Sequence, residues 1–422
     1  MKKLIAVLML LMALSGCSIT GRTSITGLLS APKHSAAESE IVKVVSEYAG
    51  ENIALKYSTS QGYVSPIQLI DVKGDEKKEA VVFYHAPNKG TNIRFALLEN
   101  TDEGWKTVLD REGLGGDVFW FETVEYPGMA GKQIAVGYLA SGISENFFVT
   151  YFTDEEKQYE DYVEVCENVV SKDLDGDGYA EILLTGRHTD GRTRVKAITM
   201  TEENGYKQIG IKVIRRQGAQ IEQIEFDNSR GGNAVVYMDY RDDTNRIYTE
   251  VFTFENNMVK NCLSVNSVSR IWPYEKPLVS RDIDDDGAIE IPVPVAEDKE
   301  PVHPENEVDV DFHVRWMDCG NGEETVKVYG IYNVQNNMFV ALPLQWQDQV
   351  KVKNDSYALK IVRAETDEDI FSVTETEYAD GATLGEYRRI VRTGTKLWLF
   401  EFDEDTDLYD IGYIIDNISV LD

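Results

Sequence analysis

Cysteine, histidine and long apolar runs are scarce in this chain of 422 residues. Besides Cys17, the cysteines are Cys166, Cys262 and Cys319, too few for a disulfide framework, so we expect small buried thiols with one bridge possible. The five histidines lack the spacing of a zinc pair, and neither a Gly-x-Ser-x-Gly motif nor a phosphate-binding glycine loop is present. The sequence therefore does not indicate an enzyme.

Basic residues are also few. The chain has 42 lysines and arginines and 73 aspartates and glutamates, which gives a formal net charge of −31. This deficit argues against nucleic acid or anionic lipid as a partner, because both require a basic face. It suits an extracellular protein that can bind divalent cations, although most of the acids are expected on a solvated surface.

One apolar run, residues 4–14, follows Lys2 and Lys3. A membrane-spanning helix needs about 20 apolar residues, so this run has the length of a signal peptide instead. The run ends at Leu14, Ser15, Gly16 and Cys17, which resembles the bacterial lipobox. The resemblance implies cleavage after residue 16 and lipid attached to Cys17. A secretory signal with an incidental cysteine is the alternative.

Lipidation would place the protein on the extracytoplasmic face of a cell membrane, where two acyl chains anchor durably. Cleavage of residues 1–16 removes two lysines and no acid, which takes the formal net charge from −31 to −33. Residues 17–36 are rich in Ser, Thr, Gly and Ala and predict a flexible tether. Residues 37–64 are predicted to hold an amphipathic helix, capped by Ser39, and a lead-in to the next region.

Residues 65–343 contain a repeat of about 50 residues in which acidic turns recur. We take one residue in each turn as equivalent, and successive equivalent residues are separated by 51, 51, 54 and 55 positions. These residues are Asp71, Glu122, Asp173, Asp227 and Asp282. Four strands in such a unit predict a β-propeller blade. A β-solenoid and a row of small sheets are the alternatives. Residues 344–422 break the repeat and predict a β-rich or α+β C-terminal domain. The predicted class is thus mainly β.

A second series of turns follows the first in phase and supports two hairpins in each unit. Its last interval is 80 residues long, which an acidic insertion at 294–312 would explain. The turns are Glu103-Gly104, Glu155-Glu156, Asn204-Gly205, Asn256-Asn257 and Asn336-Asn337.

Two of the acidic turns, at 173–181 and 282–290, carry carboxylates at positions 1, 3, 5 and 9 and a glycine at position 6. Alternate side chains of a tight loop converge, and Ca²⁺ favours six to eight oxygen ligands, including a backbone carbonyl at position 7. The alternative is a plain Asp-Gly hairpin turn. The expected ligands are Asp173, Asp175, Asp177, Tyr179 and Glu181 in the first loop and Asp282, Asp284, Asp286, Ala288 and Glu290 in the second.

These two loops resemble the FG-GAP or VCBS repeats of integrin-type β-propellers, in which the motif Asp-x-Asp-x-Asp-Gly-x-x-Asp binds calcium. Glutamate replaces the last aspartate in both loops, and Lys73 replaces one carboxylate in the loop at 71–79. The resemblance implies structural calcium sites within propeller blades.

The sequence therefore favours a non-catalytic, calcium-stabilised lipoprotein that binds an envelope protein or a glycan. An envelope polysaccharide or peptide hydrolase with an acidic site at the propeller centre is the alternative, and a role in envelope or spore-coat assembly is a third. The six tryptophans could include a sugar-stacking platform, although a tryptophan is more often part of a core.

Overall fold

The computed structural model describes most of the chain after residue 34. The described ranges are 35–58, 65–140, 146–151, 161–201, 205–229, 231–244, 246–263, 268–271, 277–295, 312–319, 323–334, 336–355, 358–377 and 385–421. Cys17, the predicted signal peptide and nearly all of the predicted tether lie outside these ranges.

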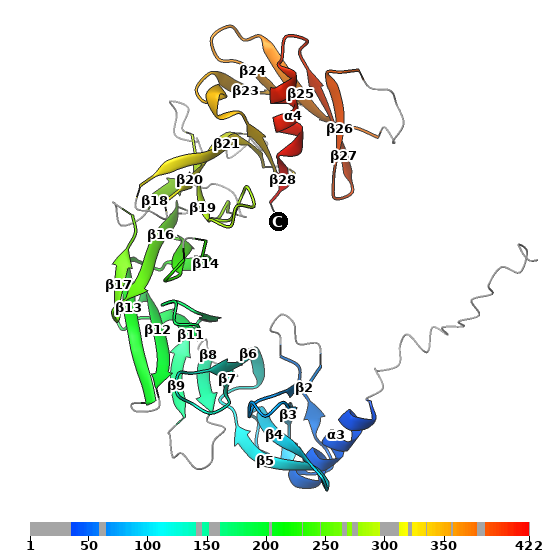
Figure 1. The fold of residues 1–422 in the computed structure, drawn as a ribbon, viewed down its shortest axis with the longest axis vertical. Coiled ribbons are helices and arrows are strands. Elements are labelled where there is room, and N and C mark those ends of the chain that lie inside the picture. The colour runs from blue at the N-terminus through cyan, green and yellow to red at the C-terminus, as the bar shows by residue number, and fades with distance from the viewer. Residues whose placement is uncertain are drawn as a thin grey trace, which may run out of the picture.

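The described residues form a mainly β fold of antiparallel sheets, which confirms the predicted class (Figure 1). Each of the first four sheets is built from strands consecutive in the sequence. The first sheet contains β1 (Ala54–Leu55), β2 (Ile67–Ile70), β3 (Glu79–His85), β4 (Arg94–Thr101) and β5 (Gly104–Glu112), with the short helix η1 (Pro87–Lys89) between β3 and β4. The second contains β6 (Asp117–Glu125), β7 (Lys132–Leu139), β8 (Asn146–Tyr151) and β9 (Tyr162–Cys166).

The third and fourth sheets repeat this order of four neighbouring strands. The third contains β10 (Asn168–Lys172), β11 (Glu181–Arg187), β12 (Arg192–Thr201) and β13 (Gly205–Gln217). The fourth contains β14 (Gln220–Asp227), β15 (Val235–Arg241), β16 (Arg246–Glu255) and β17 (Met258–Asn261), and β18 (Val268–Ile271) also pairs with β16. The repeat of four-stranded units is therefore confirmed.

The fifth and sixth sheets depart from this simple order. The fifth contains β19 (Glu290–Pro294), β20 (Phe312–Asp318), β21 (Thr325–Asn333), β22 (Met338–Leu342) and β28 (Ile418–Val420). The short helix η2 (Leu344–Trp346) leads to the sixth, which contains β23 (Val350–Asp355), β24 (Ala358–Arg363), β25 (Asp369–Glu375), β26 (Arg388–Thr393) and β27 (Lys396–Phe402). Because β28 pairs with β22, the end of the chain returns to the fifth sheet.

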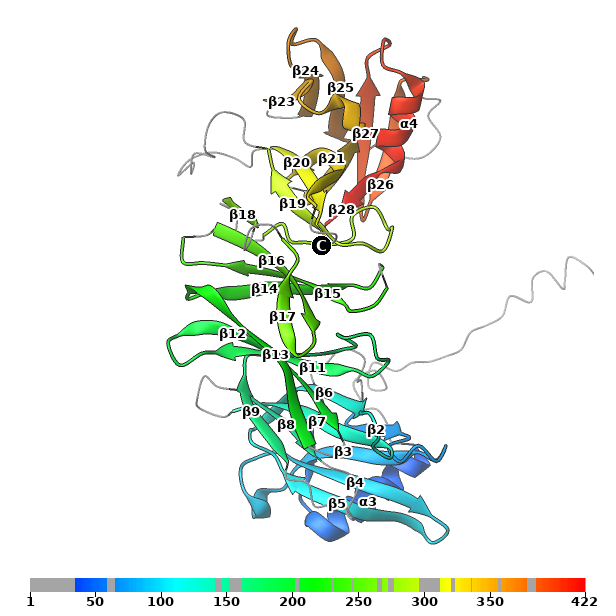
Figure 2. The same ribbon diagram turned by 60° about the vertical axis from the view of Figure 1, so that its left-hand side comes forward.

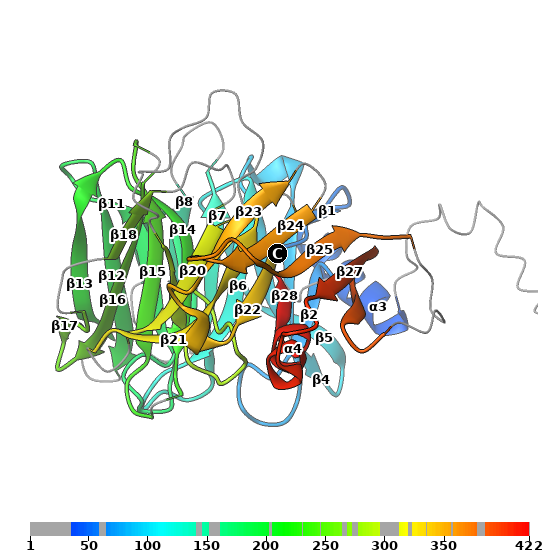
Figure 3. The same cartoon turned by 90° about the horizontal axis from the view of Figure 1, so that it is seen from above.

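The sheets follow one another along an arc, with the first strands nearer its hollow side and the last strands outside (Figure 1). The side and top views show the same succession of sheets (Figures 2 and 3). Strand residues point alternately to the two faces of a sheet. In β3, Val81 and Phe83 pack toward the second sheet, whereas Val82 and Tyr84 pack toward a helix. Each internal sheet thus buries both faces against its neighbours.

That helix is α3 (Ala36–Ala49), which covers the outer face of the first sheet with Ile41 and Val45. The predicted helix is confirmed, but the predicted cap at Ser39 is wrong. The hydroxyl of Ser35 accepts from the Glu38 amide at 3.2 Å, and the Glu38 carboxylate accepts from the Ser35 amide at 2.7 Å. This reciprocal capping box fixes the start of the helix four residues earlier than expected.

One of the aligned turn positions is also wrong. Glu122 lies inside β6, and the equivalent turn is 126–131, which has no acid to mark it. The predicted turn at Asn336 and Asn337 is confirmed, since it joins β21 to β22, the third and fourth strands of the fifth sheet.

The C-terminal residues form the predicted β-rich unit with one helix. Strands β24, β25 and β27 contain residues 358–362, 370–374 and 397–402. Helix α4 (Leu408–Asp416) begins at the N-cap Asp407, and Ile411 and Ile414 join the core shared by the fifth and sixth sheets.

We predict that contact between neighbouring sheets makes Gly131→Ala more destabilising than Gly218→Ala. Both glycines are left-handed, at φ +68 and +67, so each alanine costs about 1–2 kcal/mol from backbone strain. A Cβ at Gly131 would also lie 2.6 Å from the Val72 carbonyl oxygen, whereas one at Gly218 meets nothing within 4 Å. Overpacking should add about 1–3 kcal/mol at Gly131. Urea unfolding followed by tryptophan fluorescence checks this, and equal losses of stability would contradict it.

Candidate metal loops

Three acidic loops share one backbone conformation. They are 71–79, 173–181 and 282–290, and each leads into the strand of its sheet that starts at position 9. Positions 4 and 6 are left-handed in all three, a conformation that favours glycine. The residues are Gly74 and Glu76, Gly176 and Gly178, and Asp285 and Gly287. The sequence pattern included the glycine at position 6. It did not predict the left-handed backbone at position 4.

The first carboxylate organises each loop through backbone amides. In the 173–181 loop, Asp173 accepts from the amides of Gly176 at 2.7 Å and Gly178 at 3.0 Å. Asp282 accepts from the Asp286 and Gly287 amides at 3.1 and 2.8 Å. These bonds satisfy one side of the carboxylate while its loop stays open to solvent.

The glutamate at position 9 closes each loop from the first residue of a strand. Glu181 accepts from the Leu174 amide at 2.8 Å, and Glu290 accepts from the Ile283 amide at 3.2 Å. Each bond uses Oε2, and both glutamates are almost fully buried, with 1% and 0% of their surface exposed. Their Oε1 atoms are buried and have no hydrogen-bond partner among the residues that the structure describes. Such an atom is costly to bury unless a ligand or cation satisfies it.

Carboxylate groups cluster within the two loops at 173–181 and 282–290. In the first loop, one oxygen from each of Asp173, Asp175 and Glu181 lies within 4.8 Å of the others. In the second loop, the same holds for Asp282, Asp284 and Glu290. Burial raises the pKa of Glu181 to about 8, opposed by the Leu174 amide and reinforced by Asp175. Burial likewise raises the pKa of Glu290 to about 8. The donor set and the orphaned oxygens fit a hard divalent cation.

The remaining predicted ligands lie at the edge of each cluster. Asp177 accepts from the Tyr179 amide at 2.8 Å, and Asp286 accepts from the Ala288 amide at 2.9 Å. Asp286 also pairs with Lys327, which raises the pKa of that lysine. The second loop therefore carries a competing cation beside its fifth position.

The loop at 71–79 keeps the frame without the cluster. Glu79 accepts from the amides of Val72 at 2.8 Å and Lys73 at 3.2 Å. The ammonium of Lys73 stands at position 3 and pairs with Glu99 of β4. This loop shows that the backbone geometry does not by itself require three converging carboxylates.

The loops at 71–79 and 173–181 also join their sheets to the next one through position 2. The buried Leu174 accepts at its carbonyl from the Ala234 amide at 3.1 Å, and Val72 accepts from the Lys132 amide at 2.6 Å. A Cβ at Gly176 would lie 2.9 Å from the Gly232 carbonyl oxygen. The glycine-containing turns of the second and fourth sheets thus let an acidic loop approach closely.

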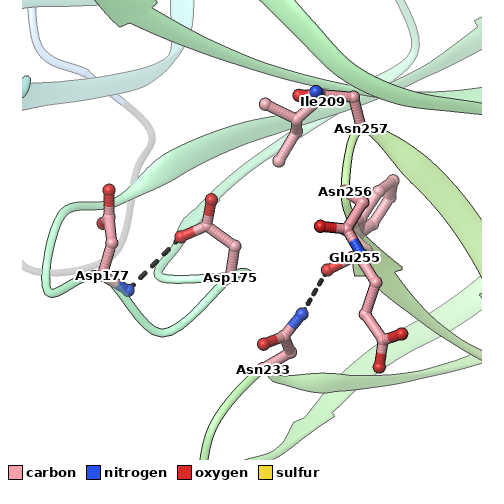
Figure 4. Close-up of a pocket in the computed structure, with 8 residues that line it drawn as sticks. Asp175, Asp177, Ile209, Asn233, Glu255, Asn256 and Asn257 are labelled. Atoms are coloured by element: carbon pink, nitrogen blue, oxygen red, sulfur yellow. Dashed lines mark hydrogen bonds between the residues drawn. The ribbon is translucent and has the colours of Figure 1, made fainter.

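A cavity of about 410 Å³ adjoins the first loop (Figure 4). Residues of the third and fourth sheets line it, and sequence spacing alone gave no signal for it. They are Asp175, Asp177, Ile209, Asn233, Phe254, Glu255, Asn256 and Asn257.

Other residues singled out in the sequence lie apart from these loops. Cys166 and Cys262 carry free thiols, Cys166 and Cys319 are buried, and Cys262 is partly exposed. Five tryptophans are buried or partly buried, and Trp272 lies outside the described residues. No tryptophan in the described ranges therefore offers an open stacking face.

We predict that metal-free protein loses stability as the pH rises from about 4.5 to about 8. In this interval the unfolded chain releases protons that the folded Glu181 and Glu290 retain, because their folded pKa values are raised from 4.5 to about 8. The folded state then binds more protons, so its free energy of unfolding falls with pH. Urea midpoints measured in chelator across this interval check it.

The double variant Glu181→Gln and Glu290→Gln should flatten this pH dependence. Glu79→Gln, a matched exchange in the loop without the cluster, is the control. If the stability of the double variant still falls with pH as in the unmodified protein, the pH dependence does not come from Glu181 and Glu290.

No helix among the described residues is both long and apolar enough to cross a membrane. No family model matches this chain, and no curated protein matches it. Among solved structures, the chain is similar to the Saccharomyces cerevisiae protein Sqt1, with a TM-score of 0.30 and 11% identity over 83% of this chain and 99% of that one.

Proposed function

We propose that the loops at 173–181 and 282–290 bind calcium as structural sites. The observation that supports this most is that Glu181 and Glu290 each belong to a carboxylate cluster and each bury an Oε1 atom that has no hydrogen-bond partner among the described residues. Oxygen ligands in a flexible loop suit Ca²⁺ better than the strict octahedron of Mg²⁺. When bound, the ion supplies charge compensation for the clustered carboxylates.

We further propose that the repeated sheets are blades of an open-ended β-propeller. Support comes from the four-stranded antiparallel order and from the placement of first strands toward the hollow of the arc (Figure 1). Helix α3 covers the first sheet where a closed ring would place another blade. Calcium in the first loop would then stiffen the junction of the third and fourth sheets through Leu174.

We propose that lipid on Cys17 holds this scaffold at the extracytoplasmic face of a membrane, where it binds an envelope protein or a glycan without catalysis. The hydrolase alternative needs two carboxyl groups with raised pKa values in a deep central pocket. Four of the acids with raised pKa values instead belong to the two loops, namely Asp175, Glu181, Asp284 and Glu290.

We predict that calcium stabilises the full chain and that Tb³⁺ reports the first loop. At free calcium 100 times the dissociation constant, each site adds about 2.7 kcal/mol to the free energy of unfolding. Tyr179 at position 7 should sensitise Tb³⁺ luminescence, whereas Ala288 at the same position cannot. Thermal unfolding and a Tb³⁺ titration competed with Ca²⁺ measure both effects.

Tyr179→Phe should remove the luminescence and keep the thermal stabilisation, whereas Glu181→Gln should weaken both. The second loop should fill at higher calcium, because Lys327 competes at Asp286. An unchanged melting temperature in saturating calcium would refute the metal assignment.

We predict that Cys17→Ser releases the protein from membranes. Without the thiol nucleophile, no diacylglycerol can be attached, so the protein should move to the aqueous fraction of a bacterial lysate. Metabolic labelling with a fatty acid should also disappear. Cys262→Ser is the control and should stay labelled, and labelling of the Cys17→Ser protein would rule out this anchor.

A further inference from the structure

The cavity beside the first loop has two chemically different walls. Asp175 and Asp177 of the loop form one wall, and both are exposed. The other wall belongs to the turn between β16 and β17, where Asn256 and Asn257 have φ values of 51 and 60. Figure 4 shows the two walls facing each other across the cavity.

Amide groups dominate the wall opposite the loop. The side chain of Asn233 donates to the Phe254 carbonyl oxygen, which fixes the turn against the start of β15. Glu255 pairs with Lys260 at 3.3 Å. The apolar side chains Ile209 and Phe254 complete the lining. The cavity therefore offers hydrogen-bond donors and acceptors beside a small apolar area.

We propose that this cavity binds a neutral polyhydroxylated ligand, the terminal sugar of a glycan. The proposal rests on the calcium function of the 173–181 loop, because Asp175 and Asp177 belong to both the loop and the cavity. Hydroxyl oxygens are ligands of the kind that Ca²⁺ accepts, so a loaded loop adds affinity for them at this wall.

Charge selects among the possible ligands. Asp173, Glu181, Asp175, Asp177 and Glu255 place five carboxylates in or beside the cavity, which exceeds the charge of one divalent ion. Anionic sugars are repelled, whereas amides of asparagine pair with neutral hydroxyl groups. The volume of about 410 Å³ lies within the range of about 300–1,000 Å³ for small-molecule sites.

The orphaned Oε1 of Glu181 is the independent observation that places a cation here. This atom is buried, and one carboxylate oxygen of Glu181 lies within 4.8 Å of an oxygen of Asp173 and of Asp175. The loop at 71–79 has Lys73 at the third position and so lacks the equivalent acidic wall.

The test uses the full chain with the calcium loops filled. Methyl α-mannopyranoside, methyl β-galactopyranoside and methyl α-fucopyranoside are the neutral probes, and glucuronate and a lysine tripeptide are the charged comparators. Saturation-transfer NMR and calorimetry measure binding. With Tb³⁺ in the loop, displacement of water by the sugar should lengthen the luminescence lifetime.

We expect at least one neutral probe to bind, and Asn256→Gly to weaken that binding at least tenfold. Glycine keeps the left-handed backbone of this turn, so the fold is preserved. Asn337→Gly is the matched control, because Asn337 also has a φ near +52 and lies in a different Asn-Asn turn. Chelator and Glu181→Gln should both abolish sugar binding.

The possible failures are distinguishable. If Tb³⁺ loads the loop and no neutral probe binds, the sugar proposal is overturned and the calcium proposal stands. If Tb³⁺ does not load, the calcium proposal fails first. Binding of glucuronate or of the lysine tripeptide with the same dependence on Asn256, without neutral binding, would overturn the ligand class.

Discussion

Burial of both faces of every internal sheet is the constraint on which this structure depends. Alternation along each strand gives two apolar faces, so a sheet such as β10 to β13 needs one neighbour on each side. Sheets joined in series cover the apolar faces of their neighbours. Only the outer faces of the first and last sheets must be covered by other elements. Helix α3 provides that solution at the first sheet through Ile41 and Val45. The arc follows from this requirement.

The acidic loops occupy the joints of this series. Their position 2 carries an apolar residue into the core, and the strand-initial glutamate must follow it inward to accept the amide of that residue. This places a carboxylate where water is excluded, and the clustered aspartates increase the electrostatic cost. The conflict is local, since Lys73 replaces the carboxylate at position 3 in the loop at 71–79. The proposed divalent cation would resolve it in the other two loops.

Much of the fold was predictable because its signals are local. Glycine and acid spacing marked the loops at 173–181 and 282–290, and apolar alternation marked the strands of four sheets. The turn at 126–131 was misplaced because it holds no acid, so only β6 pairing with β7 fixes its register. The cap of α3 was misplaced because Ser35 and Ser39 are equally good residue types, and the reciprocal bond of Glu38 decides between them.

The sequence by itself determined the strand periodicity, the acidic loops and the lipobox-like Cys17, because each depends on residues close together in the chain. Only the tertiary structure decided that Glu181 and Glu290 are buried with an unsatisfied oxygen, since their burial depends on neighbouring sheets. It also decided that Asp175 faces Asn256 across a cavity, because those residues are distant in sequence and meet only where the third and fourth sheets pack.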